Sequence, residues 1–406
     1  MYTADSLKHH PFFLCRPPAS LEKYCVNYTS PVYLYAKEAI TRQYEILKKY
    51  LPTNFKISYA VKSNPNKKIL KHICSLGVGC DIASSGELKL VLAAGFSPQN
   101  IMFTGPGKTH AEIQDAIQNK ILSLSVESLQ ELQIVNKIAG DLGVKQTVLV
   151  RINPPYTAGE STKIIGGSGV SKFGIDIEQM DSFFQTLKTK RHVRLRGIHI
   201  FNSSQILDWE KIFVNTKNVI ATAKTLCKKY HLKFSYIDLG GGFGIPYSQE
   251  EHELNVPALG TALNQWINRN TYKDFIKNTD LVLELGRFLT GFAGIYLTKV
   301  LYTKASRGTN IVIVDGGINH LARPALIGQE QPIINLTGIL ANRPGTEKYM
   351  IAGPLCTSLD CFDQAAELCI TQPGDILALL NAGAYGFTES MPLFLSHPIA
   401  QEFIID

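Results

Sequence analysis

Several features are missing from this 406-residue sequence, and each absence argues against a class of protein. No apolar run approaches the length of a membrane span, and no arginine-rich block with interleaved aromatic residues is present. We therefore expect neither a membrane protein nor a nucleic-acid-binding protein. The net charge of +7 is mild and spread along the chain. The eight cysteines show no CxxC spacing, which indicates reduced thiols rather than a disulfide framework or a metal site.

The N-terminus lacks the apolar core of a signal peptide. Polar and charged side chains occur from the third residue onward in its first stretch, MYTADSLKHHPFF. We therefore expect a cytoplasmic protein. Internal repeats and low-complexity segments are also missing, and a hydrophobic content of 45% is typical of a globular chain. Because 406 residues are too many for one ordinary core, we expect two domains.

Strand and helix patterns alternate from Phe55 onward. The expected strands are Ile57–Lys62, Gly79–Ala83, Ile101–Phe103, Leu122–Val126, Thr147–Asn153, Leu195–Phe201, Phe234–Leu239 and Leu281–Glu284. Expected helices include Lys68–Leu76, Glu87–Ala94, Ala111–Gln118, Leu129–Ala139 and Trp209–Tyr230, and Ser84–Glu87 is a capping-box sequence. Eight strands with intervening helices predict a (β/α)8 barrel, whose active site lies at the carboxyl ends of the strands.

The pattern changes after Gly294 to short strand-like runs separated by Gly and Pro turns. We therefore expect an α/β protein with two parts. Residues 36–288 form the expected barrel, and residues 1–35 and 289–406 form the expected β domain.

A lysine ends the first expected barrel strand. In Phe55–Asn64, FKISYAVKSN, apolar and polar residues alternate until Lys62, and Asn64-Pro65 then forces the chain to turn. An amine at such a place can form a Schiff base with an aldehyde cofactor. Alone, Lys62 would be read as a strand-end lysine whose stem reaches solvent.

Two later strand ends carry further chemistry. Gly240-Gly241-Gly242 follows the seventh strand, where barrel phosphate sites commonly lie, although a tight turn would also use these glycines. Glu284 closes the eighth strand, with Gly286 and Arg287 after it. A buried acid needs a cation, which a protonated pyridine nitrogen or Arg287 itself would provide.

Nine motifs together resemble one family. The sequence resembles the fold-type III, pyridoxal 5′-phosphate (PLP)-dependent ornithine and diaminopimelate decarboxylases from about residue 30 to about residue 395. The motifs, in order, are YAVKSN, GCDIASSGEL with AAGF, RINP, SKFGI, DLGGGFG, ELGRFL, VDGG, GPLCTSLD and GAYG.

The resemblance implies PLP as the cofactor, an alanine-racemase-like barrel and a homodimer with shared active sites. Lys62 is similar to the Schiff-base lysine, and Glu284 to the carboxylate on the pyridine nitrogen. Cys356 is similar to the partner subunit's cysteine that protonates the carbanion after carbon dioxide leaves. The further cofactor positions it implies are Asp81, Glu87, Arg151, Phe201, Ser204, Gly240, Gly241, Gly242, Gly286, Arg287 and Tyr385. Taken alone, Cys356 would be a small buried hydrophobe.

Three departures from the family pattern bear on the substrate. The family's acid for a distal ammonium is replaced by Thr357, with Asp360 as a substitute partner. Phe201 stands where a histidine usually stacks on the cofactor, which leaves His199 as a supporting or core residue. Arg323 is either a ligand for a substrate carboxylate or a solvated or ion-paired arginine. Arg287 and Tyr385 complete the expected substrate contacts.

These departures favour a substrate whose distal end is uncharged or masked. The branch that decarboxylates glutamate tethered to an acyl carrier protein in butirosin-type pathways is similar in GPLCTSLDC, GPGK and FLSHP, and a basic surface suits an acidic carrier protein. Diaminopimelate, ornithine or lysine decarboxylation is the alternative. A catalytically silent regulatory homologue would be expected to lack the lysine, the glycines or the cysteine, all of which are present.

Overall fold

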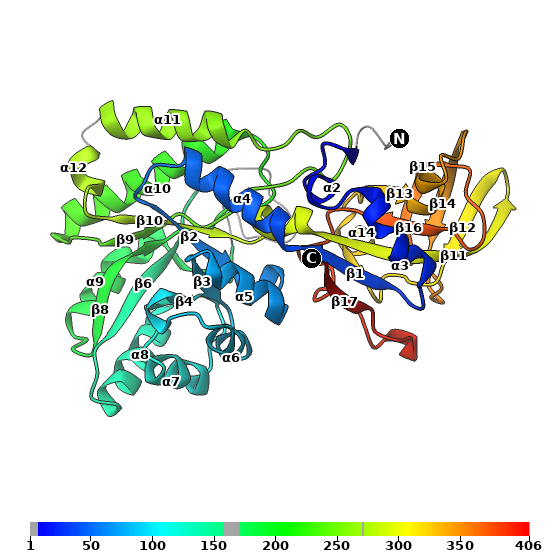
Figure 1. Ribbon diagram of the computed structural model, residues 1–406. Helices are drawn as coiled ribbons and strands as arrows, with labels where there is room; N and C mark the ends of the chain where they lie inside the picture. Colours follow the sequence, from blue (N-terminus) through cyan, green and yellow to red (C-terminus); the bar gives the residue numbers. More distant parts are fainter. Residues whose placement is uncertain (1–6, 157–169, 270–271, 406) are drawn as a thin grey trace. The chain divides into compact units, whose positions relative to one another are not determined.

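The computed structural model describes residues 7–156, 170–269 and 272–405, and it divides into two compact units. The barrel unit comprises residues 45–244 and 253–286, and the sheet unit comprises residues 1–44, 245–252 and 287–406 (Figure 1). Residues 245–252, which lie within the range expected for the barrel, group with the sheet unit. There the Asn381 side chain donates to the Pro246 carbonyl over 2.8 Å. No described helix is both long enough and apolar enough to cross a membrane.

Eight parallel strands form the closed ring of the barrel unit, which confirms the expected fold. They are β2 (Phe55–Ala60), β3 (Gly79–Ile82), β4 (Ile101–Phe103), β5 (Ser123–Val126), β6 (Gln146–Asn153), β8 (Val193–His199), β9 (Tyr236–Asp238) and β10 (Asp280–Leu285). Each strand pairs with the next along the chain, and β10 pairs with β2 to close the ring. The two-residue strand β7 (Ile175–Asp176) pairs with the end of β6. Most of these strands are short buried runs, as parallel strands covered on both faces require.

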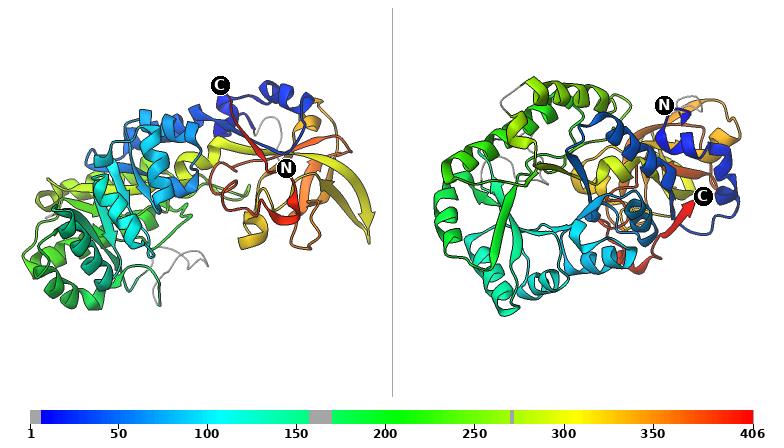
Figure 2. Two further views of the ribbon diagram at one scale, coloured as in Figure 1. Left: turned by 90° about the horizontal axis from the view of Figure 1, so that it is seen from below. Right: turned by 60° about the vertical axis from the view of Figure 1, so that its left-hand side comes forward.

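Helices surround this ring, as the right-hand view of Figure 2 shows. They are α4 (Lys37–Tyr50), which begins in the sheet unit, α5 (Lys67–Ser75), α6 (Ser85–Ala94), α7 (His110–Gln118), α8 (Leu129–Asp141), α9 (Met180–Lys188), α10 (Trp209–Tyr230), α11 (Val256–Arg269) and α12 (Lys273–Ile276). Short 3-10 turns are η2 (Val61–Ser63), η3 (Pro98–Asn100) and η4 (Ile177–Gln179). The helices after β6 and β9 are α9 and α11, whose positions the sequence patterns left unassigned.

Side-chain caps fix where several of these helices begin. The Ser84 hydroxyl accepts the Glu87 amide at the start of α6, as the sequence predicts. The Glu87 carboxylate, however, accepts the Ala83 amide over 2.7 Å, so half of the expected capping box is shifted by one residue. A complete capping box is formed instead by Thr109 and Glu112 at the start of α7.

The inner face of the barrel is layered. Met102, Leu149 and Val282 form an apolar cluster from β4, β6 and β10. Arg151 and Glu284 lie two residues further along β6 and β10, and therefore on the same strand face as Leu149 and Val282. A polar layer thus lies above an apolar one, toward the carboxyl ends of the strands.

The sheet unit contains eight strands and several short helices. Its strands are β1 (Val32–Ala36), β11 (Gly294–Ser306), β12 (Thr309–Val314), β13 (Ile333–Asn335), β14 (Thr346–Ala352), β15 (Cys361–Cys369), β16 (Ile376–Leu379) and β17 (Gln401–Ile405). Its helices and turns are α2 (Pro11–Cys15), η1 (Pro18–Leu21), α3 (Glu22–Val26), α13 (Arg287–Thr290), η5 (Gly291–Ala293), α14 (Arg323–Ile327), α15 (Leu336–Leu340) and η6 (Phe394–Ser396). N-terminal strand β1 pairs with both β11 and C-terminal strand β17.

Candidate active site

Lys62 lies beyond β2 rather than at its last position. The strand ends at Ala60, and Lys62 occupies the 3-10 turn η2. The Ser63 hydroxyl donates to the Ala60 carbonyl over 2.8 Å and so holds this turn. Gly286 packs against it, because a Cβ at this position would lie 2.7 Å from that of Ser63. The turn therefore places Lys62 at the rim of the barrel, directly after β2.

The Lys62 amine is accessible and lies between an acid and an aromatic ring. Its side chain is 43% exposed, and its Nζ lies 4.0 Å from Oδ2 of the buried Asp81. The centre of the Phe201 ring is 5.7 Å from the same atom. Phe201, rather than His199, is thus the ring that faces the amine.

Three buried carboxyl groups, Asp81 of β3, Asp238 of β9 and Glu284 of β10, lie at or near the carboxyl ends of their strands. Burial is the main cause that raises the pKa of Asp81 to about 8, and repulsion from Glu284 adds to it. Burial and the neighbouring Asp238 likewise raise the pKa of Glu284 to about 8. Burial also raises the pKa of Asp238 to about 7. A cation bound beside these groups would lower their pKa values and stabilise the carboxylates.

His199 lies beneath the carboxylates and is fully buried. Its Nε2 is 3.5 Å from Oε2 of Glu284, and its Nδ1 is 3.3 Å from the Ser125 hydroxyl. Burial is the largest cause that lowers its pKa well below the ordinary value, and the nearby Arg151 adds to it. His199 is therefore neutral at neutral pH, and its Nε2 faces Glu284 without a hydrogen bond.

Arg151 belongs to an ion pair with Glu127, a residue that sequence reasoning missed. Its Nη1 lies 3.0 and 3.2 Å from the two Glu127 oxygens. The same carboxylate accepts the backbone amides of Gly105 and Gly174, each over 3.0 Å. Glu127 thus joins the loops after β4 and β6 to Arg151. Its position directly after β5 is a strand-end signal that could have identified it.

The glycine turn after β9 interlocks with the loop after β8, which contains Ser204. Gly240 and Gly242 have φ values of 66° and 95°, in the region that favours glycine. The Ile206 amide donates to the Gly242 carbonyl over 2.8 Å. A Cβ at Gly241 would lie 2.0 Å from the carbonyl oxygen of Glu284. Close backbone packing therefore requires these glycines beside Glu284.

In the sheet unit, the candidates Arg287, Arg323 and Tyr385 form one cluster. The guanidinium carbons of Arg287 and Arg323 lie 5.0 and 5.2 Å from the centre of the Tyr385 ring. Arg287 also donates to the Tyr247 hydroxyl over 2.8 Å, and Arg323 forms an ion pair with Glu389. We call Arg287, Arg323, Tyr385, Tyr247 and Glu389 the arginine–tyrosine cluster.

Comparison with known proteins identifies the family of this chain. Residues 37–291 match the family described as pyridoxal-dependent decarboxylase, pyridoxal binding domain. The chain belongs to the pyridoxal-dependent decarboxylases.

Individual decarboxylases are similar over almost the whole chain. An L-glutamyl-[BtrI acyl-carrier protein] decarboxylase from Niallia circulans is 33% identical over 93% of this chain and 89% of that protein. A diaminopimelate decarboxylase from Aquifex aeolicus is 34% identical over 95% of this chain and 89% of the relative. The crystal structure of the Helicobacter pylori diaminopimelate decarboxylase complexed with L-lysine aligns with a TM-score of 0.85 at 29% identity, covering 95% of this chain and 94% of that chain.

The cofactor of this decarboxylase family is PLP, and the barrel residues fit it. An accessible amine lies near an aromatic face, as attachment of an aldehyde-bearing ring requires. Three buried acids with raised pKa values lie near the strand ends, and a protonated ring nitrogen beside them would stabilise the ionised carboxylate. The glycine turn and Ser204 lie in two interlocked loops, of the kind that binds phosphate.

The loop that carries Cys356 and Thr357 is held by Asp360. One Asp360 oxygen accepts the Ile318 amide over 2.8 Å, and the other accepts the Leu355 amide over 2.7 Å. Cys356 is exposed on this loop, whereas Asp360 is buried. Both carboxylate oxygens of Asp360 therefore already have backbone donors, which favours a structural role over the expected contact with a substrate ammonium.

We expect the substitution Asp360→Asn to destabilise the decarboxylase. An amide can accept only one of the two backbone N–H groups and turns its own NH2 toward the other. Leaving a buried donor unsatisfied costs about 1–3 kcal/mol of unfolding free energy. Chemical denaturation measures this loss, with the exposed Glu330→Gln as a matched acid-to-amide control. Unchanged stability with selective loss of activity on diamino acids would instead assign Asp360 to the substrate.

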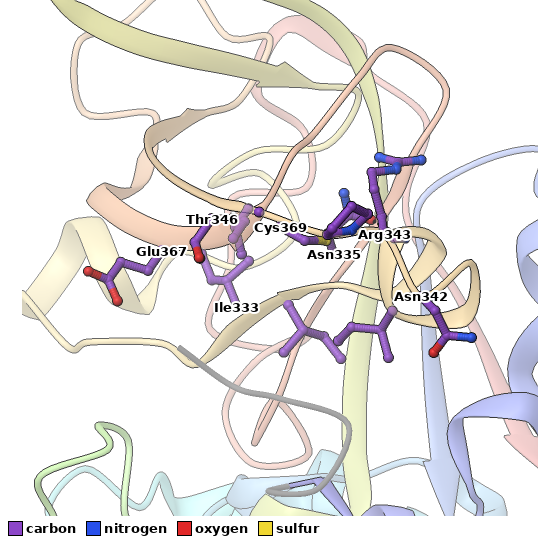
Figure 3. A pocket seen from close by; sticks show the side chains of 13 residues that line it. Ile333, Asn335, Asn342, Arg343, Thr346, Glu367 and Cys369 are labelled. Carbon is purple, nitrogen blue, oxygen red and sulfur yellow. Dashed lines mark hydrogen bonds between the residues drawn. The ribbon is translucent and has the colours of Figure 1, made fainter.

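A cavity of about 350 Å³ lies elsewhere in the sheet unit. Its lining comes from β13, α15, β14 and β15 and includes Asn335, Arg343, Glu367 and Cys369 (Figure 3). The Arg343 guanidinium already pairs with Asp375, at 3.0 Å from Nη2 to Oδ1. This cavity contains no residue that the sequence predicts for the site, and its arginine is engaged in the sheet unit.

Proposed function

We propose that this decarboxylase acts on an amino acid or amino-acyl derivative whose distal end is uncharged or masked, with carrier-protein-bound glutamate as the leading substrate. The observation that carries the proposal is the Cys356 loop. Thr357 provides no charge for a distal ammonium, and the neighbouring Asp360 is held by two backbone amides. A buried ammonium without an acid would be poorly tolerated. The similarity to the L-glutamyl-[BtrI acyl-carrier protein] decarboxylase supports this substrate class.

The chain's own residues would divide the work as follows. Bound PLP supplies the electron sink that makes loss of a carboxylate from the α-carbon accessible. Lys62 provides the amine that holds the cofactor, Phe201 covers one face, and Glu284 provides the carboxylate that keeps the ring nitrogen protonated. Cys356 carries the proton that the α-carbon takes up after carbon dioxide has left. Ser204, Gly240, Gly241 and Gly242 would hold the phosphate, and Tyr385 would reach it from the partner subunit.

The remaining residues would position these groups. Arg151 and Glu127 hold the loops after β4 and β6, and the buried Asp81 lies 4.0 Å from the Lys62 amine. Gly286 allows the close packing that places the lysine turn. We further propose a cytoplasmic homodimer with shared sites, in which Cys356 acts in the partner's barrel. All eight cysteines are free thiols, which supports a reducing compartment.

Decarboxylation of diaminopimelate, ornithine or lysine is the competing function. The 34% identity to the Aquifex diaminopimelate decarboxylase supports this competing function as much as the 33% identity to the carrier-protein relative supports the proposed one. A silent regulatory homologue is a weaker competitor, because Lys62, the glycine turn and Cys356 are all present.

Release of carbon dioxide across a panel of substrates tests the proposal. The panel contains free diaminopimelate, ornithine, lysine, arginine and glutamate, and glutamate loaded on an acyl carrier protein. We expect turnover of the loaded carrier protein to exceed that of each free amino acid by at least about tenfold in kcat/KM, roughly 1.4 kcal/mol of discrimination. Robust turnover of a free diamino acid would overturn the proposal.

A further inference from the structure

Arg323 is buried at the start of α14, and its guanidinium is held from two sides. Its Nη1 forms an ion pair with Glu389, and its Nε donates to Oε1 of Gln329 over 3.0 Å. Gln329 in turn donates to Gln331 over 3.1 Å, and Gln331 donates to the Leu380 carbonyl. This chain of hydrogen bonds fixes the orientation of Arg323 and makes Glu389 its charge partner.

The two arginines beside Tyr385 therefore differ in charge balance. Arg287 and Arg323 both lie within about 5 Å of the Tyr385 ring centre. Arg287 has the neutral Tyr247 hydroxyl as a partner, whereas Arg323 has a carboxylate. In the arginine–tyrosine cluster, Glu389 thus pairs directly with Arg323, whereas it acts on Arg287 only through the longer-range charge interaction.

Glu389 is also the accessible member of its pair. Its side chain is 37% exposed, compared with 4% for Arg323. A second carboxylate that approached Arg323 would have to displace Glu389 or lie against it. The carboxylate of Glu389 and the incoming carboxylate would repel each other, because both would contact the same buried arginine.

We propose that Glu389 is a specificity-determining residue that excludes substrates with a free distal carboxylate. This inference rests on the proposed function, because it assumes that the arginine–tyrosine cluster faces the distal end of the substrate. The exclusion explains why a site for a substrate with a masked distal carboxyl can contain Arg323, an arginine that would otherwise bind a carboxylate. The ion pair with Glu389 occupies the guanidinium of Arg323, which therefore attracts a second carboxylate less strongly.

The substitution Glu389→Gln tests the inference. Gln keeps an oxygen that can accept from Arg323, but it removes the negative charge. The probes are free L-glutamate and the same amino acid with its distal carboxyl as a thioester of pantetheine. We expect the ratio of kcat/KM for glutamate to that for the thioester to rise by about tenfold or more, the effect of one charge-assisted contact.

Two further variants separate specificity from folding. Glu389→Asp retains the charge, so its ratio should stay near that of the unmodified protein. Arg323→Gln combined with Glu389→Gln should lose the gain, because the guanidinium that Glu389→Gln releases is then absent. A structural role alone would lower kcat/KM for both probes equally and leave the ratio unchanged, which would overturn the inference.

The unmodified protein distinguishes the remaining outcomes. If it prefers the thioester but the ratio does not move in Glu389→Gln, the inference fails and the proposed function stands. If it prefers an amino acid with a free distal carboxylate, both fail. If it prefers ornithine or lysine, and Glu389→Gln removes that preference, Glu389 binds a substrate ammonium and the inference is overturned.

Discussion

The substitution Lys62→Ala should abolish the visible absorbance of protein-bound PLP and reduce carbon dioxide release by on the order of a thousandfold. Lys62 is the amine at the barrel rim that faces Phe201 and Asp81. Alanine leaves no group for covalent attachment. The absorbance spectrum of the purified protein and single-turnover release of carbon dioxide measure the two effects.

The Lys62→Ala protein should still fold. Removing the cation leaves Asp81 buried, but the pKa of Asp81 is already raised to about 8, so this group can remain protonated at neutral pH. Lys68→Ala, at an exposed position in α5, is the matched control and should retain both the colour and the activity. An unchanged absorbance band in Lys62→Ala would refute the assignment of this lysine.

Glu284→Gln should reduce kcat by about a hundredfold or more, on the order of the loss seen when a preorganised electrostatic group is removed. Gln has the shape of protonated Glu but cannot become negative. The substitution therefore separates two roles for Glu284, because only a carboxylate can stabilise a cationic ring nitrogen. Steady-state kinetics at saturating cofactor measures the loss, with the exposed Glu210→Gln as a control. A nearly silent Glu284→Gln would mean that Glu284 works as a neutral acid.

The pH dependence of stability gives an independent check on the cofactor-free protein. The pKa of Glu284 rises from an ordinary 4.5 to about 8 in the folded state, so the folded state binds its proton more tightly than the unfolded state. The contribution to the free energy of unfolding is complete below pH 4.5 and is lost as the pH rises through 8. Glu284→Gln should therefore show a weaker fall in stability over this interval, as measured by denaturation at several pH values.

Much of the fold was predictable from local sequence. The period-2 alternation around Ile57 identifies β2. The apolar run that ends at Glu284 identifies β10, because a parallel strand covered on both faces is apolar along its length. The end of β2 was misplaced, since the turn at Val61–Ser63 depends on contacts with Gly286 from the other end of the barrel chain.

The candidate site was predictable in its polar strand ends but less so in its pairings. Lys62, Asp81 and Glu284 could be named because each follows or ends a buried strand, and the structure brings them together. Glu127 carried the same strand-end signal, but its pairing with Arg151 and that of Glu389 with Arg323 could not be predicted, because ion pairs between distant segments leave no local pattern. The two backbone donors of Asp360, Ile318 and Leu355, could not be predicted either, because the sequence does not show which amides a loop carboxylate will meet.

The ring is closed by strands that are far apart in the chain, since Ser58 of β2 lies in register with Glu284 of β10. During synthesis, the lysine strand therefore emerges long before the strand that must lie beside it. A nascent chain interrupted before β10 would leave the barrel open along one side, with Lys62 present and Glu284 not yet made. The amine of Lys62 and the carboxyl of Glu284 therefore come together only once the last strand of the ring has folded against the first.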